Sequence, residues 1–162
     1  MISFHSCRTS CKMVLIIRKD FMKTDAIIFD IDGTLAKMGD RSPFDWKKVG
    51  LDTPHQDIID LMNVFVGDEY SNWTILVVTG RLEVCEKETK DWLKQYNVPY
   101  HKLFMRKTDE EFDKDVIIKA RIYNEEIEPK HNVHYVFDDR DQTVAGWRNL
   151  GLRCLQVAPG NF

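Results

Sequence analysis

Three apolar runs, each followed at once by polar residues, do most to restrict how this chain can fold. The runs and the polar residues after them are 26–29 with Asp30 and Asp32, 74–78 with Thr79, and 133–137 with Asp138 and Asp139. Continuous apolar runs of this length are typical of strands buried on both faces of a parallel sheet. Ligands of such sheets bind beyond the carboxyl ends of the strands, so the pattern predicts that these polar residues meet in one site.

Amphipathic segments separate the runs. Helical spacing of apolar residues predicts helices over 54–66, 82–96, 114–127 and 142–149, with short strands over 98–104 and 154–157. Alternating strands and helices imply an α/β fold, a three-layer sandwich around a mostly parallel, Rossmann-like central sheet. The chain has 162 residues, enough for one such domain, which we place over residues 23–162.

The first 22 residues differ in character from the rest. The apolar stretch at 13–17 is too short for a secretory signal, and Met22-Lys23-Thr24 would be a natural start just before the first strand. We therefore expect residues 1–22 to be a disordered N-terminal extension or a stretch upstream of the true start. The alternative is an additional edge strand at 13–17.

Composition narrows the functional class. The formal net charge is −3, so there is no basic coat for general nucleic-acid binding, and any contact with nucleic acid must be local. No apolar run approaches the length of a membrane span. Cys85 and Cys154 lie among apolar residues, as core fillers do, which favours a reducing compartment such as the cytoplasm. His131 and His134 point to opposite faces of a strand, which argues against a shared metal.

Two carboxylates two positions apart, Asp30 and Asp32, are followed directly by Gly33. We expect the strand to end at Asp30 and Asp32 to lie in a tight turn that Gly33 makes possible. Adjacent carboxylates repel, so the pair needs a cation or a shared proton. That arrangement suits Mg²⁺ binding and two separate chemical roles. The alternative is a strand end with two solvated acids.

Four motifs together resemble those of the haloacid dehalogenase-like (HAD-like) phosphatase superfamily. They are Asp30-x-Asp32-Gly33-Thr34, Thr79-Gly80-Arg81, Lys119 and Asp138-Asp139. A closer resemblance is to the 3′-phosphatase domain of bacteriophage polynucleotide kinase/3′-phosphatases, and it covers residues 25–162. It rests on the segments 30–38, Arg41-x-Pro43-x-Asp45, Lys114-Asp115-x-x-x-Lys119 and the run from Asp138 through Trp147 to Phe162.

The resemblance implies a HAD-like fold and assigns roles. Asp30 would be the nucleophile that forms an aspartyl-phosphate, and Asp32 the general acid and then the base, with its protonated form favoured by neighbouring carboxylates. Thr79 and Lys119 would contact the phosphoryl oxygens. The implied cofactor is Mg²⁺, held by Asp30, the backbone carbonyl of Asp32 and Asp138, with Asp139 holding a water on the metal or orienting Lys119.

The resemblance also implies substrate contacts. Arg41, Gly80 and Arg81 would bind the phosphate or the chain beyond it, Arg106 would do likewise or be a surface arginine, and Asp115 would help the site or cap its helix. For Lys119 the residues alone favour another interpretation. The apolar spacing of 114–127 would make it an exposed helix lysine, and only the resemblance places it at the phosphate.

Two departures from the family matter. The sequence holds no G-x-x-x-x-G-K-[ST] phosphate loop of a kinase, so we expect a phosphatase alone, and Asp113 stands where the family has arginine. Residues 34–54 leave room only for a loop, so we expect a minimal cap or none. An open site suits the end of a polymer better than a small metabolite that must be enclosed.

These observations predict a Mg²⁺-dependent polynucleotide 3′-phosphatase that acts on DNA or RNA ends through an aspartyl-phosphate. The alternative within enzymes is a small-molecule phosphatase such as a nucleotidase. The alternative of another class is a non-catalytic subunit that binds nucleic-acid ends. Predicted partners are 3′-phosphorylated ends and a separate kinase or ligase. DNA or RNA preference and oligomeric state stay open.

Overall fold

The structure of the protein is a computed structural model that describes residues 23–67 and 72–161. Both interpretations of residues 1–22 fall outside this part of the chain and stay predictions. The strands are β1 (Thr24–Phe29), β2 (Ala36–Lys37), β3 (Thr53–Pro54), β4 (Thr74–Leu82), β5 (Lys102–Arg106), β6 (His131–Asp138) and β7 (Cys154–Gln156). The helices are α1 (Gln56–Val66), α2 (Glu86–Gln95), α3 (Asp115–Ile122) and α4 (Asp141–Asn149), with short helical turns η1 (Trp46–Leu51), η2 (Glu83–Cys85), η3 (Thr108–Glu110) and η4 (Tyr123–Ile127). None of the helices in the described ranges is long and apolar enough to cross a membrane.

The central sheet has the strand order β5-β4-β1-β6-β7, and every neighbouring pair is parallel. This confirms the predicted α/β fold. The chain moves outward from β1 through β4 to β5, then returns to β6 on the other side of β1. The strand order therefore reverses between β1 and β6. At such a switch point the connections diverge and leave a crevice at the carboxyl ends of the strands.

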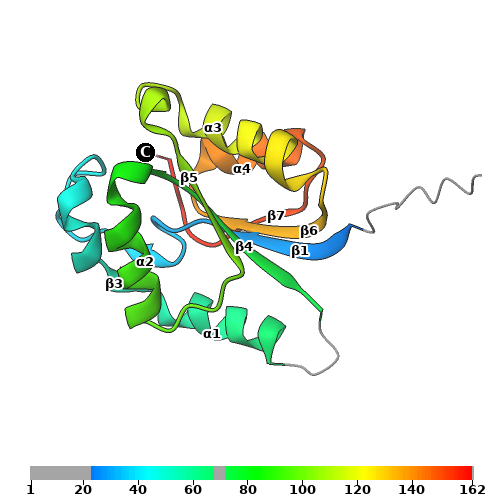
Figure 1. Ribbon diagram of the computed structural model, residues 1–162, viewed down its shortest axis with the longest axis horizontal. Helices are drawn as coiled ribbons and strands as arrows, with labels where there is room; N and C mark the ends of the chain where they lie inside the picture. The colour runs from blue at the N-terminus through cyan, green and yellow to red at the C-terminus, as the bar shows by residue number, and fades with distance from the viewer. Residues whose placement is uncertain (1–22, 68–71, 162) are drawn as a thin grey trace, which may run out of the picture.

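Helices cover both faces of this sheet, as Figure 1 shows, with α3 and α4 on one side and α1 and α2 on the other. Successive residues of β1 alternate between the two layers. Ile27 and Phe29 belong to the apolar core under α1 and α2, whereas Ala26 and Ile28 belong to the core under α3 and α4. The predicted three-layer sandwich is confirmed, and it leaves the carboxyl ends of the strands uncovered by these helices.

Strand β4 is longer than the sequence predicted. It continues to Leu82, which pairs with Arg106 of β5 beyond an irregularity in register after Val78. Thr79-Gly80-Arg81 therefore lie inside the strand rather than after it, and the expected helix start at 82 is wrong, because α2 begins only at Glu86. The physical reason is tertiary, since β5 supplies backbone pairing and Arg81 is fully buried.

The predicted helix 114–127 divides in two. Helix α3 ends at Ile122, and the π-helical turn η4 follows. Within α3, Ile117 is 55% exposed, whereas Ile118 and Lys119 are buried, so the predicted exposure of Lys119 is wrong. The buried face of α3 therefore lies at a different position around the helix axis than the apolar spacing predicted, and it includes Lys119.

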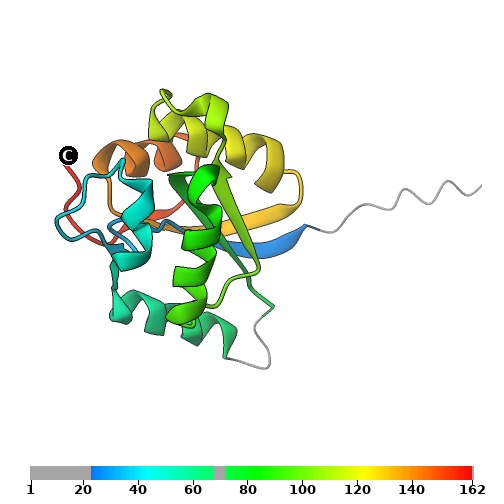
Figure 2. The same ribbon diagram turned by 60° about the vertical axis from the view of Figure 1, so that its left-hand side comes forward.

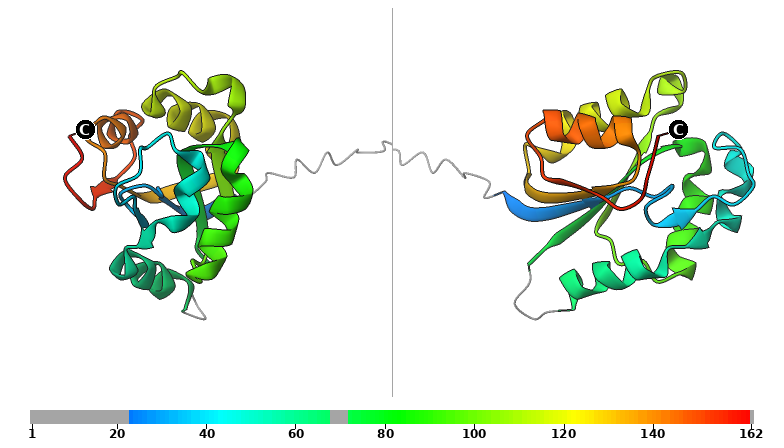
Figure 3. Two further views of the ribbon diagram at one scale, coloured as in Figure 1. Left: turned by 90° about the vertical axis from the view of Figure 1, so that its left-hand side faces the viewer. Right: turned by 180° about the vertical axis from the view of Figure 1, so that it is seen from behind.

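Residues 34–54 are more than the predicted loop. Strands β2 and β3 pair antiparallel, and η1 folds between them. We call residues 36–54 the hairpin lobe. Figure 2 shows it beside α2, and Figure 3 shows residues 157–161 running back to the same end of the sheet. The amide of Asp141 donates to the Gly160 carbonyl at 2.8 Å and holds that segment in place. The lobe is small, so the cap of this domain is minimal.

Candidate active site

Three carboxylates converge at the switch point. Asp30 follows β1, Asp138 ends β6 and Asp139 comes next, and one oxygen from each lies within 4.8 Å of the others. All three residues are buried. Gly33 allows the turn after β1 to approach them, because its φ is +88° and a Cβ there would lie 2.1 Å from the Asp139 carboxylate. The predicted meeting of the strand ends is therefore observed.

Lys119 enters this cluster from α3. Its Nζ lies 2.8 Å from a carboxylate oxygen of Asp30, 2.8 Å from Asp138 and 3.3 Å from Asp115. Burial acts to lower the pKa of Lys119, but the three carboxylates raise it well above its usual range. The lysine is 2% exposed, so the alternative that it is an exposed helix lysine is wrong. It carries its positive charge at the centre of the site.

One lysine does not neutralise the cluster. Burial raises the pKa of Asp30 well above its usual range; Lys119 opposes this shift and Asp138 reinforces it. Burial, followed by the charge of Asp138, raises the pKa of Asp139 to about 6. The anionic forms of these acids are therefore destabilised in the protein alone.

A divalent cation would relieve this excess of negative charge, and the donor set fits one. Oδ1 of Asp139 is buried and has no hydrogen-bond partner in the described part of the chain. Convergent carboxylate oxygens are the ligands that Mg²⁺ prefers. The side chain of Asp32 does not belong to this cluster, so any ligand it offers would be its backbone carbonyl.

Asp32 faces two guanidinium groups instead of carboxylates. Its Oδ2 accepts from Arg81 Nε at 2.9 Å, and its Oδ1 accepts from Arg81 and Arg41 at 2.7 Å each. The sequence had predicted that neighbouring carboxylates would favour its protonated form, and the structure gives it cationic neighbours. The bidentate pair with Arg81 fixes the orientation of the carboxylate.

Asp52 completes this network from the position just before β3. It is 3% exposed, and its carboxylate accepts from Arg41 Nε and Arg81 Nη2 at 2.7 Å each. Trp92 of α2 donates to its backbone carbonyl at 2.7 Å. Sequence reasoning missed Asp52, because an acid in a predicted loop is expected to be solvated and no local pattern marks it.

The irregular part of β4 contributes two further groups. The buried hydroxyl of Thr79 accepts from the Arg81 amide at 3.3 Å and can still donate its own proton. At Gly80 a Cβ would lie 2.1 Å from Oδ1 of Asp115. The glycine therefore makes room for the Asp115 carboxylate beside the strand.

Asp115 joins two of the predicted site cations. Its carboxylate lies 3.4 Å from Arg106 Nη2 and 3.3 Å from Lys119 Nζ. Burial acts to raise the pKa of Asp115, but Lys119 and Arg106 hold it below its usual range. The residue faces the site, and the N-cap of α3 is Lys114 instead. Arg106 is 7% exposed, so the alternative of a surface arginine is wrong.

These groups line a cavity of about 290 Å³. Its walls include Asp30, Asp32, Thr79, Gly80, Arg81, Arg106, Asp115, Asp139 and Arg140 together with Met38, Pro43, Phe44 and Trp46 of the hairpin lobe. Arg41 is not among them, since Asp32 and Asp52 take up its guanidinium. Arg140 is a lining residue to which the sequence analysis gave no role. Its place directly after Asp138-Asp139 was the available signal.

Comparison with known families agrees with this geometry. The family model described as the polynucleotide kinase PNKP phosphatase domain matches residues 24–162. The chain belongs to this phosphatase-domain family. It is therefore a HAD-type phosphatase domain, as the motifs predicted.

Individual relatives of this phosphatase domain point the same way. A candidate bifunctional polynucleotide kinase/RNA ligase of Autographa californica nuclear polyhedrosis virus is 34% identical over 129 residues, which are 78% of this chain and 18% of the relative. That relative belongs to a baculovirus, whereas the sequence motifs suggested a bacteriophage family.

Two solved structures share the fold. A chain in a structure of a Pnkp1/Rnl/Hen1 complex aligns with a TM-score of 0.82 and 31% identity over 87% of this chain and 48% of that chain. A chain in a structure of the Pnkp1/Rnl/Hen1 RNA repair complex aligns with a TM-score of 0.81 and 31% identity over 86% of this chain and 44% of that chain. This phosphatase domain thus spans less than half the length of the relatives it matches.

Proposed function

We propose that this phosphatase domain removes the terminal 3′-phosphate from nucleic-acid ends in a Mg²⁺-dependent reaction, with an aspartyl-phosphate formed on Asp30. The observation that carries the proposal is the buried cluster at the floor of the cavity. There Asp30 contacts Lys119 at 2.8 Å and lies within 4.8 Å of the Asp138 and Asp139 oxygens. A carboxylate beside a fixed cation and a set of metal-binding oxygens is arranged for attack on a phosphoryl group.

In the first step an oxygen of Asp30 attacks phosphorus, and the bond between phosphorus and the 3′ oxygen breaks. Lys119 and the Thr79 hydroxyl hold the phosphoryl oxygens, and Asp32 gives its proton to the leaving oxygen. Asp30, Asp138 and Asp139 would hold Mg²⁺, which would supply positive charge where the two anions meet.

In the second step water attacks the phosphorus of the aspartyl-phosphate and gives a proton to Asp32. The bond between phosphorus and Asp30 breaks, so inorganic phosphate leaves and the free carboxylate returns. Arg81 and Arg41 keep Asp32 pointed at the reacting oxygen through their pairs with it. Asp52 holds both arginines, so we assign Arg41 and Asp52 as positioning residues and Arg81 and Arg106 as cavity groups that approach the substrate.

The substrate end is the finer part of the proposal. The cavity of about 290 Å³ lies at the low end of small-ligand sites, and the short hairpin lobe contributes its apolar lining. That shape suits a terminal phosphate whose polymer continues outside. The names of the relatives refer to RNA ligase and RNA repair, which favours RNA ends and a separate kinase or ligase as partner.

Phosphate release from 3′-phosphorylated oligonucleotides, 5′-phosphorylated oligonucleotides and a free nucleotide tests the function, each with Mg²⁺ and with EDTA. We expect release from the 3′ end in Mg²⁺ alone. Asp30→Asn should abolish it, because the amide has nearly the same shape but is not a nucleophile. Asp91→Asn, on the exposed side of α2, is the matched control. Equal rates at both ends, or a free nucleotide as best substrate, would favour the nucleotidase alternative.

A further inference from the structure

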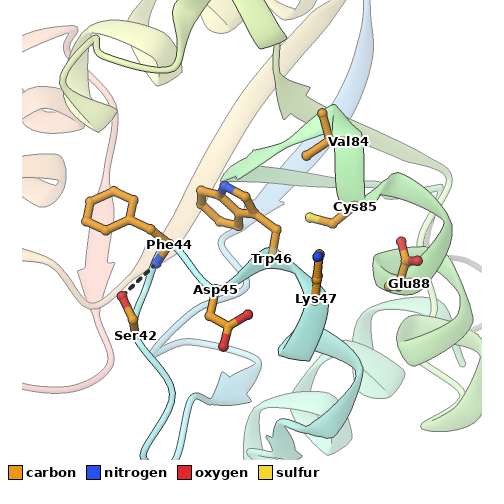
Figure 4. Close-up of a pocket in the computed structure, with 8 residues that line it drawn as sticks. All are labelled: Ser42, Phe44, Asp45, Trp46, Lys47, Val84, Cys85 and Glu88. Atoms are coloured by element: carbon orange, nitrogen blue, oxygen red, sulfur yellow. Dashed lines mark hydrogen bonds between the residues drawn. The ribbon is translucent and has the colours of Figure 1, made fainter.

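A second hollow lies beside the catalytic cavity and shares two aromatic residues with it. Its volume is about 610 Å³, and Phe44 and Trp46 line both spaces. Figure 4 shows the Trp46 ring between Phe44 and the segment that carries Val84 and Cys85. The two hollows therefore adjoin at Phe44 and Trp46.

The local sequence presents Phe44 at the tip of a tight turn. The amide of Asp45 donates to the Ser42 carbonyl at 3.0 Å, and Pro43 occupies the second turn position, which its fixed φ suits. The Phe44 amide donates to the Ser42 hydroxyl at 3.3 Å. These bonds fix the backbone of the turn from which the Phe44 ring projects.

Phe44 is exposed in a way that a role in the core does not explain, whereas Trp46 beside it is half-buried. Phe44 is 71% exposed, and its ring stands edge-on to Trp46 with centroids 6.1 Å apart. Val84, on the far side of the second hollow, is 59% exposed. Grouped exposed apolar side chains around a hollow mark a binding surface.

The charges around the second hollow indicate which part of a nucleic acid it would take. Its charged lining residues are Asp45, Lys47 and Glu88, two acids and one base. Such a lining does not attract phosphates by charge. Aromatic faces, by contrast, bind nucleobases of any sequence by stacking.

We propose that Phe44 and Trp46 form a stacking wall for the last two bases of the substrate strand. The terminal base lies on the side of the catalytic cavity and the preceding base in the second hollow. The inference rests on the proposed function, since it places the polymer that continues from the 3′-phosphate. It adds a base-binding subsite that makes the domain prefer oligonucleotides over phosphates without bases, whatever their sequence.

The test uses 3′-phosphorylated tetranucleotides, as DNA and as RNA, that are intact or abasic at the last or the preceding position. For the parent protein we expect kcat/KM to fall about 5- to 150-fold for each abasic position. In Phe44→Ala the ratio between intact and terminally abasic substrate should approach one. Phe44→Tyr keeps an aromatic face and should restore the ratio. Phe112→Ala, at a side chain 95% exposed and outside both hollows, should leave it as in the parent.

A parent ratio near one, or a ratio that Phe44→Ala leaves unchanged, overturns the stacking wall while the 3′-phosphatase function stands. If no 3′-phosphate is released at all, the proposed function fails instead. The wall is then judged by fluorescence anisotropy of the labelled tetranucleotides with the Asp30→Asn variant. If the intact strand binds more tightly than the abasic strand and Phe44→Ala abolishes this difference, the stacking wall is supported. If intact and abasic strands bind equally well, the stacking wall is rejected.

Discussion

Replacing Asp139 by asparagine should stabilise the metal-free protein at neutral pH. Burial and the neighbouring Asp138 raise the pKa of Asp139 from 3.8 to about 6. A carboxyl whose pKa is raised on folding binds its proton more tightly in the native state, so the free energy of unfolding falls as pH rises through that interval. The loss is absent below about pH 4 and complete above about pH 6. Asparagine carries no charge, so the variant does not lose this part of the free energy of unfolding.

The size of the effect follows from the shift. Each pKa unit corresponds to about 1.4 kcal/mol. The raised pKa of Asp139 therefore lowers the free energy of unfolding by at most about 3 kcal/mol. Residual solvent at the cavity reduces the expected gain of Asp139→Asn to about 2 kcal/mol. The amide can also donate to the adjacent carboxylates, which the Asp139 oxygen cannot do when ionised.

Urea unfolding of the parent and Asp139→Asn, in EDTA at pH 4 and pH 7.5, measures this difference. We expect near-equal stability at the lower pH and a more stable variant at the higher one. Added Mg²⁺ should stabilise the parent at pH 7.5 and the variant much less, because one of its ligands is lost. The exposed Asp40→Asn serves as control. A variant that is no more stable than the parent at pH 7.5, or a gain of equal size at both pH values, would refute the reasoning.

Three further predictions concern the groups around this carboxylate. Asp32→Asn should slow hydrolysis of an oligonucleotide 3′-phosphate far more than hydrolysis of a nitrophenyl phosphate, because a good leaving group needs little protonation; equal losses in a rate assay would count against the general-acid role. Lys119→Met should destabilise the metal-free protein by about 3–5 kcal/mol in urea unfolding, since it leaves buried carboxylates unpaired, whereas Lys90→Met on the surface of α2 should change little. Gly80→Ala should lower both thermal stability and kcat, because the new methyl would lie 2.1 Å from the Asp115 carboxylate and displace it; a variant with parental melting temperature and rate would show that this close approach is unimportant.

The sequence alone was enough to predict the parallel sheet and the place of the site. Short apolar runs specify buried strands locally, and Gly33 specifies the turn after β1 by its backbone freedom. Once the strands are parallel, Asp30 and Asp138 must meet at one edge of the sheet. The resemblance in motifs predicted a phosphatase, and the family match confirms the phosphatase-domain family.

Tertiary structure decided the partners of the charged side chains. Helical spacing placed Lys119 outside, yet it is buried against carboxylates from two strands that lie far away in the sequence. No local sequence pattern marks Asp52, because its role is to bind Arg41 and Arg81, which come from separate segments. The energy of a buried charge depends on what surrounds it in space, and a linear pattern does not contain that information. The same holds for the extension of β4 to Leu82, which exists only because β5 pairs with it.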